Sequence, residues 1–301
     1  DADRVSKKWS GVRYLRLLSP FIIQFTFGAL LSASFIFYLF SGSIFVSWPF
    51  LCMTLVLMVA NDVFRRYYLR LGVQLSVYFF IIFSLSAIIL PFVFSTIGVL
   101  IFLFSGSVSL LFMFGYLALA RAAVPALRAK QRPMIVAVLC IFAAVNVFYF
   151  TNLIPPIPLA MRDAVVAHDI RRIAGGYELA VETEMLWERV APGQTFHHRG
   201  SGERVFVYTA IFAPKNLSTR IVHHWQEFDD ARNEWMSRDR LTFRITGGAK
   251  TGYRGYSAKS ALSPGRWRVD VETERGQVVG RVRFRVVEMA DEKPAIERIL
   301  K

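Results

Sequence analysis

With 301 residues and a mean hydropathy of +0.40, the chain has room for two domains and is unusually apolar for a soluble protein. Its net charge of +14 is of the kind found in nucleic-acid-binding proteins. Most of that charge lies in the apolar half, and no recognition-helix or zinc-finger pattern accompanies the rest, so we expect no nucleic-acid partner. Cys52 and Cys140 both fall in apolar segments, which excludes a disulfide framework or thiolate zinc site in the polar half.

Composition changes sharply near Pro155. Before it, 12 Lys and Arg residues accompany 3 Asp and Glu residues, whereas 24 accompany 19 after it. The first half is therefore almost wholly apolar with isolated cationic clusters, and the second half resembles an ordinary soluble domain. Two domains of different character are expected.

Five stretches of the first half are apolar and long enough to cross a hydrocarbon core, which takes about 20 helical residues. They are residues 17–40, 44–63, 71–94, 97–120 and 134–154. A backbone in lipid must satisfy its own hydrogen bonds, so helices are expected. The sequence thus predicts a domain of five transmembrane helices over residues 1–154, with the lipid bilayer as its partner. Small residues such as Gly28, Ser105 and Gly106 would permit close helix packing.

All Lys and Arg residues of this half lie before the first predicted helix, between the second and third, or between the fourth and fifth, so they fall on one side of the predicted membrane domain. They are Arg4, Lys7, Lys8, Arg13, Arg16, Arg65, Arg66, Arg70, Arg121, Arg128, Lys130 and Arg132. The intervening loops, at residues 41–43 and 95–96, carry no charge. The positive-inside rule assigns the cationic side to the cytoplasm. With five crossings, the N-terminus is cytoplasmic and the C-terminal domain lies in the periplasm, outside a bacterial inner membrane.

A connector is expected at residues 155–176. Pro155, Pro156 and Pro158 end the fifth helix, since proline cannot continue one. Residues 159–173 predict a short amphipathic helix at the membrane surface, which Gly175 and Gly176 end.

From residue 177 the apolar pattern changes to a period of two, which is typical of strands. Ile221, His223 and Trp225 share one face of a strand, and Trp225 and Trp267 are expected in the core. Two predicted strands show the clearest alternation of apolar and charged residues. In the first, Trp267, Val269 and Val271 alternate with Arg266, Arg268, Asp270 and Glu272. In the second, Val282, Phe284 and Val286 alternate with Arg281, Arg283 and Arg285. We predict an all-β immunoglobulin-like sandwich over residues 177–290, followed by a tail at 291–301.

Several segments of this domain resemble a bacterial domain of unknown function. They are His223–Gln226, Trp235, the run Gly252–Lys259 and the closing Pro264–Val269. The resemblance covers about residues 180–287 and extends to membrane proteins that carry this module. Because the family has no assigned activity, the resemblance implies an architecture and no reaction.

Three constellations were weighed as catalytic or metal sites. His197–His198 and His223–His224 are adjacent pairs that point to opposite strand faces, so one from each would need a further ligand such as Glu203 or Asp229. Ser257 and Lys259 would share a face, but no oxyanion-hole motif lies nearby. The acidic sets at 182–188 and 229–234 are expected at the solvated surface. We predict no catalytic residue, no metal and no cofactor.

A binding role fits the sequence better. Trp235 and Tyr256 lie near basic residues in segments rich in glycine, where flat aromatic rings and cations can grip a sugar or an acidic polymer. The predicted binding residues are His223, Trp235, Arg254, Tyr256 and Lys259. The favoured function is a membrane-anchored domain that binds an envelope protein or an anionic glycan. Two alternatives stay open: an accessory subunit of a larger membrane complex, with the helices as its interface, and an envelope glycan-processing enzyme.

Overall fold

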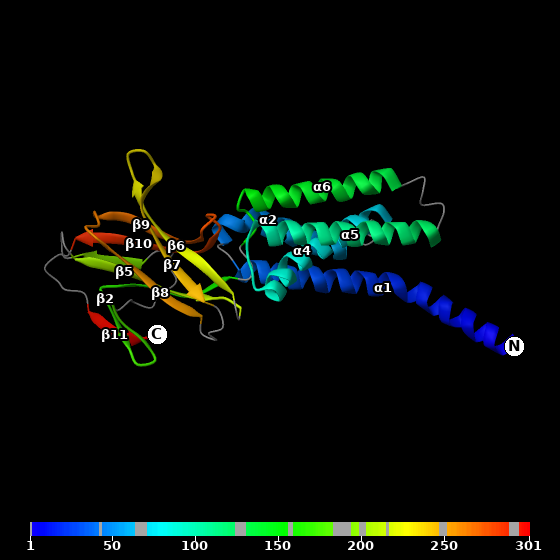
Figure 1. The fold of residues 1–301 in the computed structure, drawn as a ribbon, viewed down its shortest axis with the longest axis horizontal. Helices are drawn as coiled ribbons and strands as arrows, with labels where there is room; N and C mark the ends of the chain where they lie inside the picture. Colours follow the sequence, from blue (N-terminus) through cyan, green and yellow to red (C-terminus); the bar gives the residue numbers. More distant parts are fainter. Residues whose placement is uncertain are drawn as a thin grey trace. The chain divides into compact units, whose positions relative to one another are not determined.

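The structure is a computed structural model that describes residues 2–41, 44–63, 71–123, 131–155, 159–182, 194–198, 203–214, 217–246, 252–288 and 295–301. The chain divides into two compact units, one of helices and one of strands, with the β unit beginning at Pro155 (Figure 1).

The helical unit contains α1 (Ala2–Phe40), α2 (Ile44–Val63), α4 (Leu71–Phe94), α5 (Val99–Ala123) and α6 (Gln131–Phe150). Four of them are long and apolar enough to cross a membrane: α4, α5, α6 and the part of α1 from Leu17 to Phe40. The apolar part of α2, Val46–Asn61, is shorter than the other four. Membrane association is thus supported by four of the five predicted spans, and the helix positions agree with the sequence within a few residues.

Contacts inside the unit show that α1 and α2 run in opposite directions. Gln24 of α1 and Asn61 of α2 exchange hydrogen bonds, each side-chain nitrogen donating to the other's backbone oxygen at 3.2 and 3.1 Å. Further along, Tyr38 of α1 packs on Phe50 of α2 with ring centroids 4.6 Å apart. As residue numbers rise along α1 from 24 to 38, those of the contacting residues in α2 fall from 61 to 50. Helix α2 is therefore antiparallel to α1 along most of its length.

The same alternation continues to the last helix. Tyr78 and Phe83 of α4 lie beside Tyr116 and Phe102 of α5, respectively, so these two helices are antiparallel. Phe102 stacks on Tyr149 of α6 at 3.7 Å, whereas Arg121, near the other end of α5, reaches Gln131 at the start of α6. Helices α5 and α6 are therefore antiparallel as well.

The predicted small-residue contact on α5 is present in the bundle interior. Ser105 and Ser109 are fully buried, and each hydroxyl donates to the backbone carbonyl one turn earlier, at 2.7 Å. Beside them, a β-carbon added to Gly106 would lie 2.9 Å from a ring carbon of Phe142 and 3.0 Å from one of Phe83. The absence of a side chain at Gly106 thus lets the aromatic rings of α4 and α6 approach α5.

The β unit contains eleven strands in the part of the chain that is described. Their bounds are β1 (Ala160–Ala167), β2 (Asp169–Ile173), β3 (Gly176–Glu182), β4 (Gln194–His198), β5 (Arg204–Phe212), β6 (Ser218–Asp229), β7 (Glu234–Thr246), β8 (Tyr253–Ser260), β9 (Gly265–Thr273), β10 (Val278–Glu288) and β11 (Ile296–Leu300). They form a five-stranded sheet of order β4-β10-β9-β6-β7, a middle sheet β1-β5-β8 and a small sheet β11-β3-β2.

The middle sheet is buried on both faces, as strand β5 makes clear. Val205 and Val207 of β5 pack into a core with Trp225 and Trp267 of the five-stranded sheet, both at most 2% exposed. The alternate residues Tyr208 and Ala210 pack into a second core, with Leu179, Val181 and Ile299 of the small sheet. The prediction that Trp225 and Trp267 are core residues is confirmed.

Two predictions about the ends of this unit are wrong. Residues 159–173 form strands β1 and β2 instead of an amphipathic helix, because Ala164 and Val166 pack into one core while Val165 and Ala167 pack into the other. A short apolar run buried on both faces resembles a helix in its sequence. The predicted tail contains β11, which pairs with β3 and places Ile299 opposite Leu179.

A first prediction concerns the contact at Gly106. Gly106→Leu is expected to lower the free energy of unfolding of the helical unit by about 1–3 kcal/mol, because the new side chain overpacks against Phe83 and Phe142. The measurement is thermal unfolding of the full chain in mild detergent. Gly115→Leu is the matched control, because nothing lies within 4 Å of an added β-carbon there. Equal effects of the two substitutions would contradict the packing role.

Candidate binding face

The structure distributes the five predicted binding residues over different faces. His223 is in the core between the five-stranded and middle sheets, with its side chain fully buried. Its ring nitrogens lie 2.8 Å from the hydroxyl of Ser257 and 3.0 Å from that of Thr209. Burial lowers the pKa of His223 to about 3, so the ring is neutral at physiological pH.

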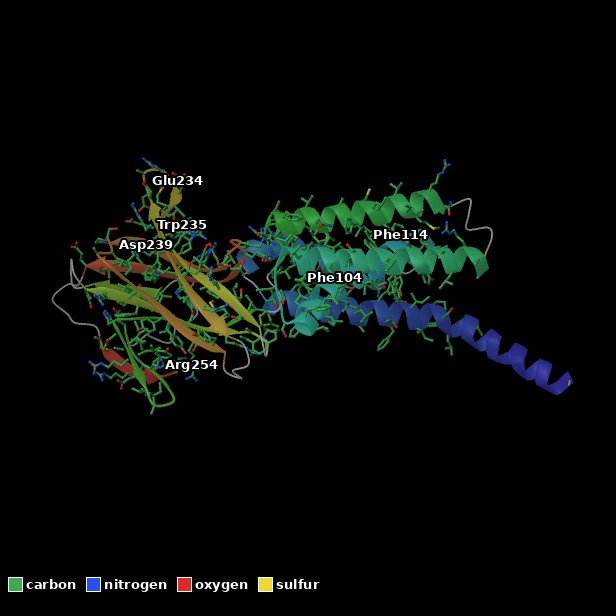
Figure 2. All side chains as sticks on the ribbon, in the orientation of Figure 1. Phe104, Phe114, Glu234, Trp235, Asp239 and Arg254 are labelled. Atoms are coloured by element: carbon green, nitrogen blue, oxygen red, sulfur yellow. The ribbon has the colours of Figure 1, made fainter. Side chains whose placement is uncertain are left out.

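Arg254, Tyr256 and Lys259 all belong to β8, yet they have different partners. Arg254 donates to the carbonyl of Gly175 at 2.9 Å, and Tyr256 packs against the ring of Tyr177, so both face the small sheet. Lys259 pairs with Asp239 of β7. Trp235 is on the outward face of β7, and Figure 2 shows it far from Arg254. The five residues do not form one site, and their role in binding stays a prediction.

The catalytic alternatives gain no support from the geometry. Ser257 accepts a hydrogen bond from the Trp225 indole at 3.0 Å and lies beside His223, all in the core, while Lys259 is paired with Asp239. Among the described residues, no three His, Cys, Asp or Glu side chains are placed to hold a metal ion. The side chains of His197 and His198 lie outside the described residues, as do Glu184 and Glu188.

His168 is a buried polar centre that the sequence did not indicate. Its ring nitrogens lie 2.8 Å from Glu182 and 2.9 Å from Glu203, and the ring stacks on Phe196 at 4.1 Å. Burial acts to lower the pKa of His168, but the hydrogen bonds and negative charges of the two carboxylates outweigh it, so the pKa is raised. This cluster links the small sheet to the start of β5.

Six arginines define an arginine face on the outward side of the five-stranded sheet. They are Arg240 of β7, Arg266 and Arg268 of β9, and Arg281, Arg283 and Arg285 of β10. The pairing of β9 with β10 sets Arg268 directly opposite Arg283, and Arg266 directly opposite Arg285. The Cα atoms that carry neighbouring arginines are thus about 5 Å apart across the strands and about 7 Å apart along them.

Two buried carboxylates partly neutralise the arginine face. Asp270 is 3% exposed and receives two hydrogen bonds from Arg281, at 2.5 and 2.7 Å. Glu272 is 6% exposed and contacts Arg240 at 3.1 Å and His224 at 3.0 Å. In the described part of this face, Asp270 thus partners Arg281 and Arg268, Glu272 partners Arg240, and Asp230, in a turn at the edge, pairs with Arg266.

Aromatic rings and a side-chain amide orient the two arginines of β9. The Arg268 guanidinium lies 4.3 Å from the ring centre of Trp235 and donates to Gln226 at 2.6 Å. The Arg266 guanidinium lies 3.8 Å from the ring centre of Phe228, which itself contacts Trp235. Burial lowers the pKa of Arg268; Asp270 opposes this effect, and Arg281 and Arg283 add to it.

The arrangement is suited to binding anions. Like charges directly opposite each other destabilise a sheet, so rows of arginines are costly unless an anion neutralises them. A guanidinium offers a planar fork of donors that matches carboxylate, sulfate or phosphate oxygens. The described part of this face carries excess positive charge on guanidinium groups, and contacts with aromatic rings orient those of Arg266 and Arg268. Arg285, on β10, is exposed and has no carboxylate partner among the described residues.

Comparison with known proteins gives one family match. Residues 218–286 match the family described as "Protein of unknown function (DUF2914)". The matched segment runs from the start of β6 into β10, so it contains all six residues of the arginine face. It agrees with a C-terminal domain of unknown function, as the sequence indicated. A search of curated proteins found no match.

Solved structures that share a segment with this chain include β-glucosidase from Listeria innocua. The identity is 13%, the TM-score is 0.22, and the match covers 32% of this chain and 15% of the enzyme chain. For the same enzyme in complex with gluconolactone, the values are 12%, 0.20, 36% and 16%. This chain therefore spans only about a sixth of the length of these enzymes, and TM-scores this low carry no argument about its fold or activity.

A second prediction follows from the neutral, buried His223. Its folded pKa of about 3 lies below the 6.5 of an exposed imidazole, so on acidification the unfolded chain binds a proton that the folded chain does not. The free energy of unfolding is expected to fall by up to about 1.4 kcal/mol per pH unit below pH 6.5. This contribution is absent in His223→Asn, so the variant is expected to lose less stability than the parent between pH 7 and pH 5. Thermal unfolding of the full chain at the two pH values measures the difference. Identical pH dependence in the variant and the parent would contradict the assignment.

Proposed function

We propose that this protein is anchored in a bacterial inner membrane and presents its β unit to the periplasm, where the arginine face binds an acidic envelope partner. That partner is an anionic glycan or an acidic segment of a protein. The observation that carries the proposal is the placement of Arg268 opposite Arg283 and Arg266 opposite Arg285 on the outward face. A sheet that serves only as structure has no need for opposed like charges.

The orientation rests on the number of crossings. Four helices meet the criteria of length and hydropathy, and α2 is antiparallel to α1 over the stretch from Gln24 to Tyr38. A helix of 20 residues is about 30 Å long, which matches a hydrocarbon core. We therefore take α2 as the fifth crossing, and the cations at alternate helix ends then favour a cytoplasmic N-terminus and a periplasmic β unit.

The strand order supports an immunoglobulin-like sandwich within the β unit. The middle sheet β1-β5-β8 corresponds to strands A, B and E of that fold, and the neighbours β10-β9-β6-β7 correspond to G, F, C and C′. On this assignment, the arginine face is the outward face of the GFC sheet. The small sheet is an addition inserted between β1 and β5, with β11 as its third strand.

The accessory-subunit alternative draws on ridges of small residues and on the lack of a catalytic constellation. In the bundle, Ser105, Gly106 and Ser109 are buried, and a β-carbon added to Gly106 would meet Phe83 of α4 and Phe142 of α6, so this ridge is already covered within the unit. No observation favours the accessory-subunit or enzyme alternative over binding, and both stay predictions.

A third prediction tests the orientation. Alkaline phosphatase fused after residue 301 is expected to be active, because it folds only outside the cytoplasm, and a fluorescent protein that matures only in the cytosol is expected to be dark at the same position. A fusion after residue 123, at the end of α5, should give the opposite pair of results. Fluorescence after residue 301 would contradict a periplasmic β unit.

A fourth prediction tests the arginine face. The full chain, held in nanodiscs of neutral phosphatidylcholine, is expected to bind polygalacturonate more weakly as salt rises, since exposed charges are screened. The double variant Arg283→Gln with Arg285→Gln should bind about 100-fold more weakly, on the basis of about 1.5 kcal/mol or more for each charge-assisted contact. Biolayer interferometry measures both effects.

The controls separate this site from other basic residues. Arg172→Gln with Arg298→Gln removes the same charge from the small sheet, where both arginines are exposed, and is expected to leave binding within about twofold of the parent. A loss in that control equal to the loss in the double variant would mean unspecific attraction. A loss confined to Arg254→Gln with Lys259→Gln would instead place binding at the residues predicted from the sequence.

A further inference from the structure

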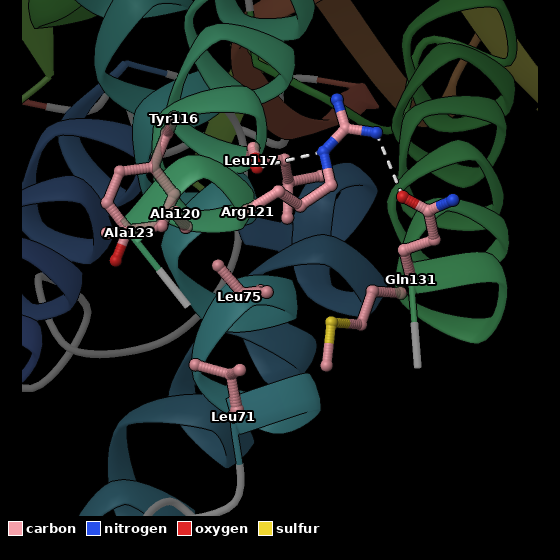
Figure 3. Close-up of a pocket in the computed structure, with 9 residues that line it drawn as sticks. Leu71, Leu75, Tyr116, Leu117, Ala120, Arg121, Ala123 and Gln131 are labelled. Carbon is pink, nitrogen blue, oxygen red and sulfur yellow. Dashed lines mark hydrogen bonds between the residues drawn. The ribbon is translucent and has the colours of Figure 1, made fainter. Parts of the chain in front are cut away.

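A cavity of about 300 Å³ lies among the first turns of α4 and α6 and the last turns of α5 (Figure 3). Most of its lining is apolar: Leu71, Leu75, Tyr116, Leu117, Ala120, Ala123 and Met134. Leu75, Leu117 and Met134 are buried, whereas Tyr116 is 42% exposed and Ala123 is exposed. The lining therefore passes from the interior of the bundle to its surface, so the cavity is open to the outside of the bundle.

The polar groups of the cavity belong to Arg121 and Gln131. The Arg121 Nε donates to the carbonyl of Leu117 at 3.2 Å, and its Nη1 donates to Oε1 of Gln131 at 2.9 Å, as Figure 3 shows. A guanidinium has five N–H donors, so these two contacts leave three for another acceptor. Within the described residues, no carboxylate pairs with Arg121.

The helix ends around this cavity are cationic in sequence. The segment before α4 carries Arg65, Arg66 and Arg70, and the segment between α5 and α6 carries Arg128 and Lys130. Arg132 follows Gln131, and Asp62 is the one acidic residue between position 4 and Pro155 in the sequence. The segments that adjoin these helix ends are therefore basic in sequence, with Asp62 as the one acidic residue among them.

A ligand that suits both parts of the cavity must be amphiphilic. A water-soluble anion would leave the apolar lining without contacts, and an uncharged lipid would leave the Arg121 guanidinium without a counter-ion. Basic pockets between transmembrane helices bind the headgroups of acidic lipids, and apolar walls beside them accommodate acyl chains. We propose that this cavity is a binding site for an anionic phospholipid, with the phosphate at Arg121 and part of one acyl chain against Leu71, Leu75 and Met134.

The test uses the full chain in a neutral detergent, titrated with dioleoyl phosphatidylglycerol and followed by native mass spectrometry. Arg121→Gln is expected to weaken retention of this lipid about tenfold, the loss of one charge-assisted contact, while retention of phosphatidylcholine is unchanged. Arg132→Gln is the matched control, because Arg132 is an exposed arginine in the same helix turn as Gln131 and does not line the cavity. It should leave retention within about twofold of the parent.

A second pair of variants tests the apolar part without changing any charge. Ala120→Phe and Ala123→Phe place a ring in the cavity, at the inner wall and at the exposed end respectively, and each should weaken phosphatidylglycerol retention about tenfold. Ala123→Phe decides the result if Ala120→Phe does not give a folded protein by size-exclusion chromatography.

Three outcomes would overturn the proposal. Equal losses in Arg121→Gln and Arg132→Gln would mean a diffuse attraction to the basic helix ends. Full retention of phosphatidylglycerol by the folded phenylalanine variants would mean that the acyl chain of the lipid does not occupy the cavity. Competition by soluble glycerophosphoglycerol as strong as by the lipid would make this a site for a free phosphate ester.

Discussion

The arginine face is held in place by the apolar side chains on the opposite side of the same strands. Trp267, Val269 and Phe284 fill the core beneath β9 and β10, and a shift in register by one residue would expose them and bury the arginines. That penalty far exceeds the repulsion between neighbouring guanidinium groups. Burial of the core thus keeps Arg268 opposite Arg283, with Asp270 beneath them as a buried counter-charge. The proposed binding surface thus follows from a register that burial of the core enforces.

Much of this arrangement was predictable from the sequence. Alternation in β6, β9 and β10 set Trp225, Trp267 and Phe284 on the apolar faces of their strands, and the structure pairs β9 with β10 as a hairpin. A hairpin with arginines at alternate positions of both strands already implies two adjacent rows of positive charge. The glycine-rich segment 252–259 nevertheless favoured a binding site there, because aromatic and basic residues follow one another closely along the chain. Density along the chain does not indicate which face each side chain takes.

Other features depended on contacts between distant segments and left no local signal. His168 meets Glu182 and Glu203 because three strands from two sheets converge, and the run Ala164–Ala167 became a strand because cores exist on both sides of it. A helix and a doubly buried strand have similar apolar composition over so short a stretch. In the helical unit, the apolar stretch of α2, Val46–Asn61, is shorter than those of the other four helices, and the antiparallel course of α2 is clear only from the contacts of Asn61 and Phe50.

The pairing of β3 with β11 has a consequence for biosynthesis. Glu178 and its partner Arg298 are 120 positions apart in the chain, and β11 provides one of the two neighbours of β3 in the small sheet. A ribosome that adds about 5–20 residues per second needs on the order of ten seconds to make that interval. During this time the nascent β2–β3 hairpin exposes one unpaired edge, which is the kind of surface that aggregates or recruits a chaperone. The arrival of β11, rather than formation of the large core, therefore completes the folding of this unit.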